Sequence, residues 1–231
     1  MGHRKSCDGI GPLGFTLFGV ALAWRRMNGG PHPYQELSLS MTGMVLGIVL
    51  SALYAFCLFK SDASMAWAKK AHRNHQAGTY AMAIGMVWFW LLVAPNVKGS
   101  LSFMGSLSMD LGEFTKLKPY LQLGVPLFCV GMIMYVREFL FVRGLGLCLL
   151  MAAAPILYAA DFETAPMRVL MPLVAYGMII KGLFYVGMPY LFRDGVSWAT
   201  ATKGRWKVLS SSGLVLALVI LGCSLTVWRG Y

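Results

Sequence analysis

The residue with the clearest capacity for chemistry is Lys181, which lies near the middle of the apolar run 169–192. An ammonium group at the centre of a bilayer costs about 3 kcal/mol on insertion scales, so it must lie in a protein interior, pair with an anion or lose its proton. Tyr176 and Tyr185 lie within two helical turns of it, and their hydroxyl groups could line a polar cavity. Two interpretations stay open: a lysine that handles protons or anions, and a structural lysine that reaches the lipid surface or bonds backbone carbonyls.

Other polar clusters lack the companions that metal binding or catalysis requires. His72 and His75 would share one face of a helix, but their segment offers only Asp62 as a carboxylate and no cysteine. The serines at 210–212 stand outside a G-x-S-x-G frame, and no predicted span holds a histidine that could serve as their base. We therefore predict no catalytic residue, no metal ligand and no cofactor, which favours a non-enzymatic protein.

The elements that must position Lys181 are membrane spans. Of the 231 residues, 58% are hydrophobic and 13% are charged, whereas about 25% of residues are charged in soluble domains. A span needs roughly 20 apolar residues and must satisfy its own backbone hydrogen bonds, which lipid cannot do. The predicted fold class is therefore all-α, a polytopic integral membrane helical bundle that forms a single membrane domain.

The net charge of +11 is explained by membrane topology, because Lys and Arg concentrate in the cytoplasmic loops of membrane proteins. We therefore expect no nucleic-acid partner. The five cysteines form no C-x-x-C pair, and four of them lie in apolar runs, as is typical of small hydrophobic residues that are not disulfide-bonded. They are Cys7, Cys57, Cys129, Cys148 and Cys223.

Six apolar runs are predicted to form three helical hairpins over 37–95, 119–160 and 161–231, with an extracytoplasmic loop over 96–118. Some apolar residues of that loop could form a short helix on the membrane surface. The turns of the first and third hairpins are predicted to be polar loops. The predicted spans cover 37–59, 79–94, 119–136, 144–160, 169–192 and 208–228.

Residues 1–36 form a separate N-terminal segment with two open interpretations. Its order of basic, apolar and small residues is typical of a secretory signal peptide. Asp8, Pro12 and the pair Arg25 and Arg26 instead favour an uncleaved membrane segment over 10–24. Such a segment would be interfacial or would add a seventh transmembrane helix.

Lys and Arg counts predict the orientation of the hairpins. Ten of these residues lie in the three hairpin turns, and five lie in the opposite loops and at the C-terminal end of the last span. By the positive-inside rule the hairpin turns are cytoplasmic. Arg25 and Arg26 would then lie outside, which is the one local violation.

The first and third hairpins share an order of features: an apolar run, a basic residue, Asp, Trp, a basic cluster and a second apolar run. Duplicated hairpins are common in transporters, but Trp and Lys or Arg anchor any span at an interface, so convergence explains the match as well. The glycines at 144 and 146 predict close helix contacts.

Three functions are compatible with these features. The leading expectation is a non-enzymatic accessory or structural membrane subunit, with the lipid bilayer and another membrane protein or a second copy as its partners. The alternatives are a small transporter or channel that uses Lys181, and a membrane-embedded enzyme that modifies lipids. The compact loops favour a bacterial inner membrane.

Overall fold

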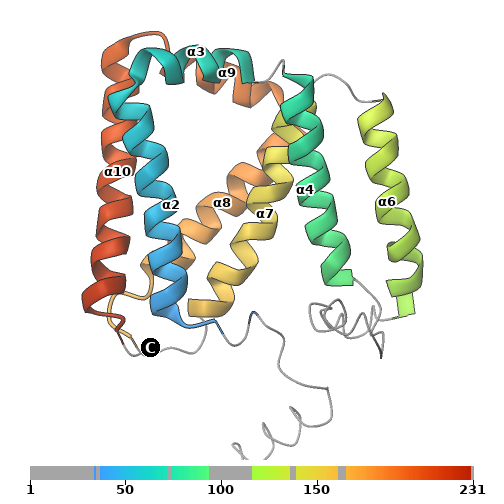
Figure 1. The fold of residues 1–231 in the computed structure, drawn as a ribbon, viewed down its shortest axis with the longest axis horizontal. Coiled ribbons are helices and arrows are strands. Elements are labelled where there is room, and N and C mark those ends of the chain that lie inside the picture. Colours follow the sequence, from blue (N-terminus) through green and yellow to red (C-terminus); the bar gives the residue numbers. More distant parts are fainter. Residues whose placement is uncertain are drawn as a thin grey trace, which may run out of the picture. The chain divides into compact units, whose positions relative to one another are not determined.

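The structure, a computed structural model, describes residues 34, 37–71, 74–93, 116–135, 139–160 and 165–229 (Figure 1). All regular elements in these residues are helices, which confirms the predicted all-α class, and all belong to the compact unit Pro33–Tyr231. Most of the predicted segments 1–36 and 96–118 lies outside the described residues. The helices are α2 (Leu39–Phe59), α3 (Ser61–Ala71), α4 (His75–Val93), α6 (Lys118–Tyr135), α7 (Leu140–Ala160), α8 (Leu170–Gly187), α9 (Tyr190–Ala199) and α10 (Lys203–Thr226).

Five of these helices are long and apolar enough to cross a membrane: α2, α4, α7, α8 and α10. The predicted run 119–136 is helical as α6, but it does not belong to this group. Its first half is less apolar than the other spans because it contains Lys118, Gln122 and Pro126. The predicted hairpins are therefore supported by five membrane-length helices and one less apolar helix, while the predicted seventh segment over 10–24 lies outside the described residues.

Two short helices, α3 and α9, occupy segments that the sequence predicts to be loop or span. α3 occupies the turn that connects the two spans of the first hairpin. Asp62 in the first helical turn of α3 and Lys69 and Lys70 in its last helical turn complement the helix dipole. α9 begins within the predicted span 169–192, after a break at Pro189, whose ring removes a backbone donor. The loop prediction was wrong here because a short helix on a membrane surface tolerates such charges.

The first and third hairpins now share an order of elements as well as of residues. In each, a long helix is followed by a short one that crosses the end of the bundle and then by a second long helix, as α2, α3 and α4 and as α8, α9 and α10 (Figure 1). Each short helix exposes a tryptophan, Trp67 with 60% and Trp198 with 57% of its surface accessible. The arrangement matches the parallel order of features in the sequence.

The main apolar core lies at the end of the bundle opposite α3 and α9. There the first turns of α2 and α8 meet the last turns of α7 and α10, and Leu39, Met171 and Ile220 are fully buried. The ring of Trp228 is also fully buried, and its Nε1 donates to the carbonyl oxygen of Pro166 over 3.0 Å. Four helices are therefore joined tightly at this end.

Glycines bring α7 close to its two neighbours. A Cβ atom at Gly144 would lie 2.6 Å from the backbone nitrogen of Met82 in α4. A Cβ atom at Gly146 would lie 2.8 Å from the carbonyl oxygen of Gly182 in α8. Only glycine permits such a close approach of two backbones, so the close helix contacts predicted at 144 and 146 are confirmed.

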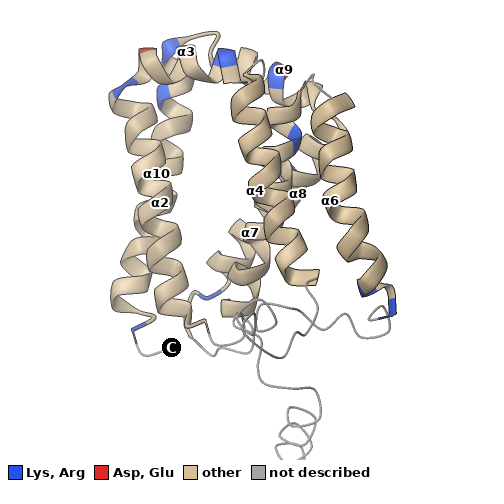
Figure 2. Cartoon of the chain, turned by 45° about the vertical axis from the view of Figure 1, so that its right-hand side comes forward, with Lys and Arg blue, Asp and Glu red and all other residues tan. Residues whose placement is uncertain are grey.

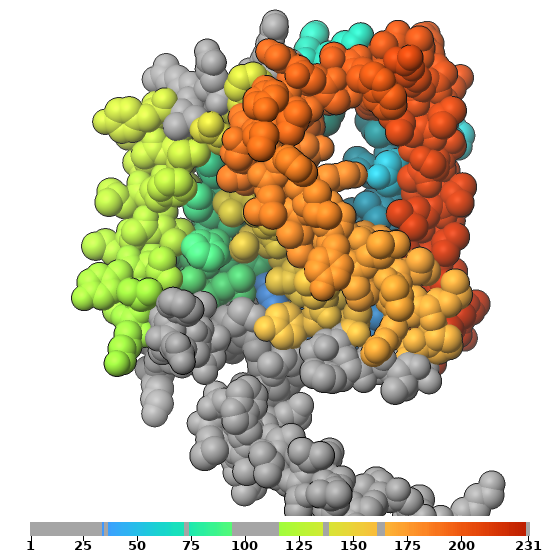
Figure 3. Space-filling model, turned by 180° about the vertical axis from the view of Figure 1, so that it is seen from behind, coloured from blue at the N-terminus to red at the C-terminus, as the bar shows by residue number. Residues whose placement is uncertain are grey.

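The helices diverge between the apolar core and the α3/α9 end. α8 runs diagonally and moves away from α2 and α10 as it approaches α9 (Figure 1). The space-filling view shows the resulting opening, bordered by α8 and α9 on one side and by α10 on the other, with α2 behind (Figure 3). We call this space the opening.

The charged residues gather at the two ends of the bundle (Figure 2). Of the thirteen described Lys and Arg residues, eight lie at or near the α3/α9 end, four lie at the other end, and Lys181 lies between them. The eight at or near the α3/α9 end are Lys60, Lys69, Lys70, Arg143, Arg193, Lys203, Arg205 and Lys207.

Candidate functional site

Lys181 is the twelfth of the eighteen residues of α8, and its side chain is exposed. Val174 and Met178 of the same helix pack against the apolar core, together with Leu46 and Leu50 of α2. At 3.6 residues per turn, Lys181 projects within about 20° of Val174 and about 60° of Met178. The ammonium group is therefore carried on the side of α8 that is directed toward α2 and the opening.

Tyr185 lies one turn further along α8 and projects about 40° from Lys181. Its ring makes an edge-on contact with Phe192 of α9, with the ring centroids 5.3 Å apart. Tyr185 therefore joins α8 to α9 beside the opening, and it projects from the same side of α8 as Lys181.

Tyr176 does not project from this side of α8. It projects about 140° from Lys181 around the helix, and 57% of its surface is exposed. A tyrosine on the outer side of a span contacts lipid or a neighbouring protein. Of the three residues singled out from the sequence, the structure therefore brings together Lys181 and Tyr185 and separates Tyr176 from both.

Tyr54 is the site residue that sequence reasoning missed. Its ring occupies the space that Gly213 of α10 leaves free, so the pairing of a large and a small residue fixes the ring between α2 and α10. Tyr54 is thereby carried by α2, the helix that lies behind the opening in Figure 3. Neither residue has a distinctive sequence context, and only the packing of α2 along α10 reveals the pair.

A chain of aromatic contacts extends from Tyr185 to the surface helices. Phe192 contacts Phe141 of α7 with centroids 6.4 Å apart, and Phe141 contacts Trp67 of α3 at 6.0 Å, both at steep angles. Such edge-to-face pairs contribute about 0.5 to 1.5 kcal/mol each beyond the area that they bury. They hold α3, α7, α8 and α9 together beside the opening.

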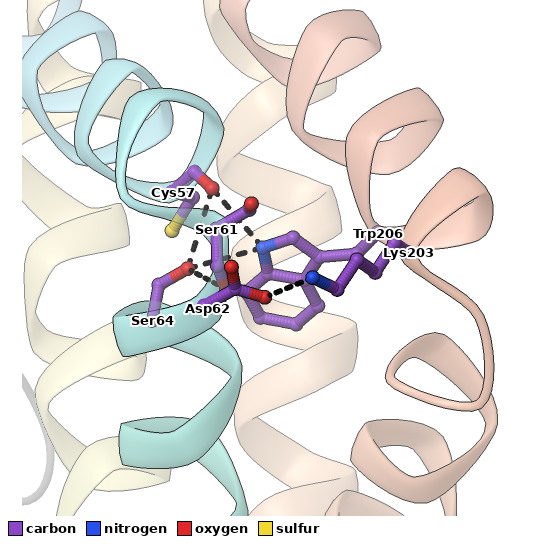
Figure 4. A network of polar contacts seen from close by, with 6 residues as sticks. All are labelled: Cys57, Ser61, Asp62, Ser64, Lys203 and Trp206. Atoms are coloured by element: carbon purple, nitrogen blue, oxygen red, sulfur yellow. Dashed lines mark hydrogen bonds and ion pairs between the residues drawn. The ribbon is translucent and has the colours of Figure 1, made fainter.

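The opposite corner is held by a polar network around Trp206 of α10 (Figure 4). Its Nε1 donates to the carbonyl oxygen of Cys57 and to Oγ of Ser64, each over 3.1 Å. Beside it, Nζ of Lys203 and a carboxylate oxygen of Asp62 form an ion pair of 2.7 Å. The α2–α3 corner is thereby attached to the start of α10, and both ends of the opening are closed by defined contacts.

The charge of Lys181 has no counterion within the part of the chain that the structure describes. The acidic residues there are Asp62 and Asp194, and each is already paired at the α3/α9 end, with Lys203 and Arg193 respectively. Glu138, Asp161 and Glu163, the acidic residues nearest in depth by sequence, lie outside the described residues.

No metal centre is found in the described residues, where no three His, Cys, Asp or Glu side chains cluster. His75 begins α4 and is exposed, whereas His72 lies outside the described ranges. The hydroxyl groups of Ser211 and Ser212 donate to the carbonyl oxygens of Val208 and Leu209 within the same helix. The polar side chains that α8 carries toward the opening are thus one amine, from Lys181, and one phenol, from Tyr185.

Compared with known proteins, the chain matches no family model, no curated protein sequence and no solved structure.

Proposed function

We propose that the chain is a non-enzymatic integral membrane subunit, and that the opening binds a transmembrane helix of a partner protein through Lys181. The observation that supports this is the exposed ammonium group on the side of α8 directed toward the opening, with no acidic partner in the described residues. In hydrocarbon such a charge is unfavourable by about 3 kcal/mol. A carboxylate on an incoming helix would neutralise it and fill the space.

The contacts around the opening fit this role. The core at one end and the Trp206 network at the other hold the two sides apart, so a helix that packs over the opening from the lipid side would leave these contacts intact. Apolar side chains exposed on α8 and α10 would provide the van der Waals surface that drives association in lipid. We expect the partner to be another membrane protein or a second copy of this chain.

Photo-crosslinking tests this proposal with a matched pair of tyrosines. Tyr185 and Tyr176 of α8 are each replaced by benzoylphenylalanine, which keeps the phenyl ring of tyrosine, carries a photoreactive benzoyl group in place of the hydroxyl group and leaves Lys181 in place. After irradiation in the native membrane, we expect a discrete protein adduct from position 185 and lipid adducts from position 176. Lys181→Leu in the same background should remove the adduct at 185. Lipid adducts alone at both positions, or an adduct that persists with Lys181→Leu, would contradict the proposal.

A second candidate is a small transporter or channel that uses Lys181, and the position of Tyr185 on the same side of α8 favours it. An amine and a phenol one turn apart would provide the polar surface that a proton or an anion needs in the opening. In proteoliposomes carrying a pH-sensitive dye, the chain would then conduct protons or anions. Both Lys181→Arg and Lys181→Leu should abolish this flux if the amine titrates. If Lys181→Leu keeps the flux and raises stability, the lysine is structural.

A further inference from the structure

A separate hollow of about 350 Å³ lies at the α3/α9 end of the bundle. It forms where the last turn of α3 meets the last turns of α9 and the turn that follows, so the first and third hairpins both contribute to it. The residues around it combine two cations, two hydroxyl groups and two small apolar side chains. They are Lys69, Arg193, Val196, Ser197, Thr200 and Ala201.

The electrostatics of the hollow are positive. Lys69 has no ion pair with any residue that the structure describes, because Asp62 at the other end of α3 pairs with Lys203. Arg193 uses its Nε to bind the carboxylate of Asp194 over 3.0 Å, and the terminal guanidinium nitrogens keep their four N–H donors. Both partners of that pair are more than half exposed, so it constrains the arginine only weakly. The hollow therefore offers donors and positive charge to an anion.

The two hydroxyl groups favour a particular kind of anion. Oγ of Ser197 donates to the carbonyl oxygen of Asp194 over 2.8 Å, and Oγ1 of Thr200 donates to that of Val196 over 2.7 Å. Their protons are used within α9, and their lone pairs stay available as acceptors. A ligand with a phosphate group could bind the two cations. If the same ligand also carries hydrogen-bond donors next to the phosphate, such as the hydroxyl groups of a glycerol or an amine, these could donate to the two hydroxyl oxygens.

The depth of the hollow matches that of lipid head groups. Trp67 of α3 and Tyr190 and Trp198 of α9 are all exposed, and such aromatic residues concentrate at the membrane–water interface. α9 presents Phe192, Val196 and Ala199 on one side and Arg193 and Asp194 on the other, as expected for a helix lying in the interface plane. We therefore expect the phosphate groups of one leaflet at the level of Lys69 and Arg193.

We propose that this hollow binds the phosphodiester head group of an anionic phospholipid through Lys69 and Arg193, with Ser197 and Thr200 accepting hydrogen bonds from the head group. The site is distinct from the opening and does not depend on the proposed function. Its ligand would come from the leaflet at the basic end of the bundle.

The test measures lipid binding to the purified full chain by native mass spectrometry in detergent. Phosphatidylglycerol, phosphatidylcholine and inorganic phosphate are compared as probes. We expect phosphatidylglycerol to be retained in preference to phosphatidylcholine, and inorganic phosphate to compete poorly because it lacks the acyl chains. Equal binding of the two lipids, or displacement of phosphatidylglycerol by inorganic phosphate at equal concentration, would overturn the lipid site.

Variants locate the binding. Lys69→Ala and Arg193→Ala should each weaken phosphatidylglycerol binding about fivefold, and Lys69→Arg should restore it. Lys70→Ala is the matched control, because Lys70 is also exposed in the last turn of α3 but does not line the hollow. Circular dichroism checks that each variant is folded. If Lys70→Ala weakens binding as much as Lys69→Ala, the attraction is a general effect of the basic end and the proposal is wrong.

Discussion

The indole nitrogen of Trp206 lies 3.1 Å from the carbonyl oxygen of Cys57, and this hydrogen bond joins the first turn of α10 to the last turn of α2 across 149 residues of sequence (Figure 4). The same nitrogen also donates to Oγ of Ser64 and so joins α10 to α3. A single donor therefore fixes the corner where three helices meet. The ion pair between Lys203 and Asp62 beside it is exposed and contributes less.

Removal of this donor should destabilise the protein. Trp206→Phe keeps an aromatic ring but removes the indole donor, so the Cys57 carbonyl and the Ser64 hydroxyl keep only the hydrogen bonds that Ser64 makes to Cys57 and Ser61. We expect a cost of about 1 kcal/mol in the free energy of unfolding. Thermal unfolding in detergent would measure it. Trp198→Phe is the control, because Trp198 is exposed and contacts Arg205 through its ring face, which phenylalanine also offers. Equal unfolding temperatures for the two variants would show that the network is not stabilising.

Reciprocal hydrogen bonds between two serines should stabilise the pairing of α2 with α10. Oγ of Ser40 donates to the carbonyl oxygen of Ser224 over 3.1 Å, and Oγ of Ser224 donates to that of Ser40. Hydrogen bonds between membrane helices average about 0.6 kcal/mol. We expect Ser40→Ala and Ser224→Ala each to lower the free energy of unfolding by about that amount. Ser211→Ala should have no effect, because its hydroxyl bonds only within α10. If Ser211→Ala lowers the free energy of unfolding as much as Ser40→Ala and Ser224→Ala do, the hydrogen bonds between α2 and α10 are not the cause of the effect.

Two glycines of different surroundings provide a third test. Gly146→Ala places a Cβ atom 2.8 Å from the carbonyl oxygen of Gly182 and should separate α7 from α8, which lowers the free energy of unfolding by about 1 to 3 kcal/mol. Gly177→Ala in α8 meets no atom within 4 Å, and alanine favours helix by up to about 1 kcal/mol. The first variant should thus unfold earlier and the second should not. If Gly146→Ala is as stable as the natural chain, the two backbones are not in close contact.

Composition was sufficient to predict the helical class, because long apolar runs with few charges leave no alternative to helices. The close contacts at Gly144 and Gly146 could also be predicted, since small residues in spans act by allowing approach. α3 and α9 could not be recognised as helices, because Trp, Lys and Asp near a span end are equally typical of a polar loop. Their helical form depends on contacts such as that between Trp67 and Phe141, which join segments far apart in the sequence.

The candidate site shows the same limit. Lys181 could be found from sequence because a charge in an apolar run is conspicuous. Tyr176 lies five residues before Lys181 and Tyr185 four residues after it, so helix geometry alone separates the two tyrosines. The packing of Val174 and Met178 against the core showed which side of α8 is directed toward the opening. Tyr54 could not be found, because it belongs to a different hairpin and reaches the site through the space left by Gly213.

The uneven distribution of Lys and Arg predicts the orientation of the bundle. The α3/α9 end carries more of these residues than the other end (Figure 2), so the positive-inside rule predicts that this end lies in the cytoplasm. In a variant with its cysteines replaced, Lys70→Cys should react with a membrane-impermeant maleimide only after the cells are opened, and Arg229→Cys should react in intact cells. Both positions are exposed at opposite ends of the described chain, so each controls for the accessibility of the other. Labelling of Lys70→Cys in intact cells would show that the orientation is the reverse of the predicted one. The hollow at Lys69 and Arg193 would then take its lipid from the other leaflet.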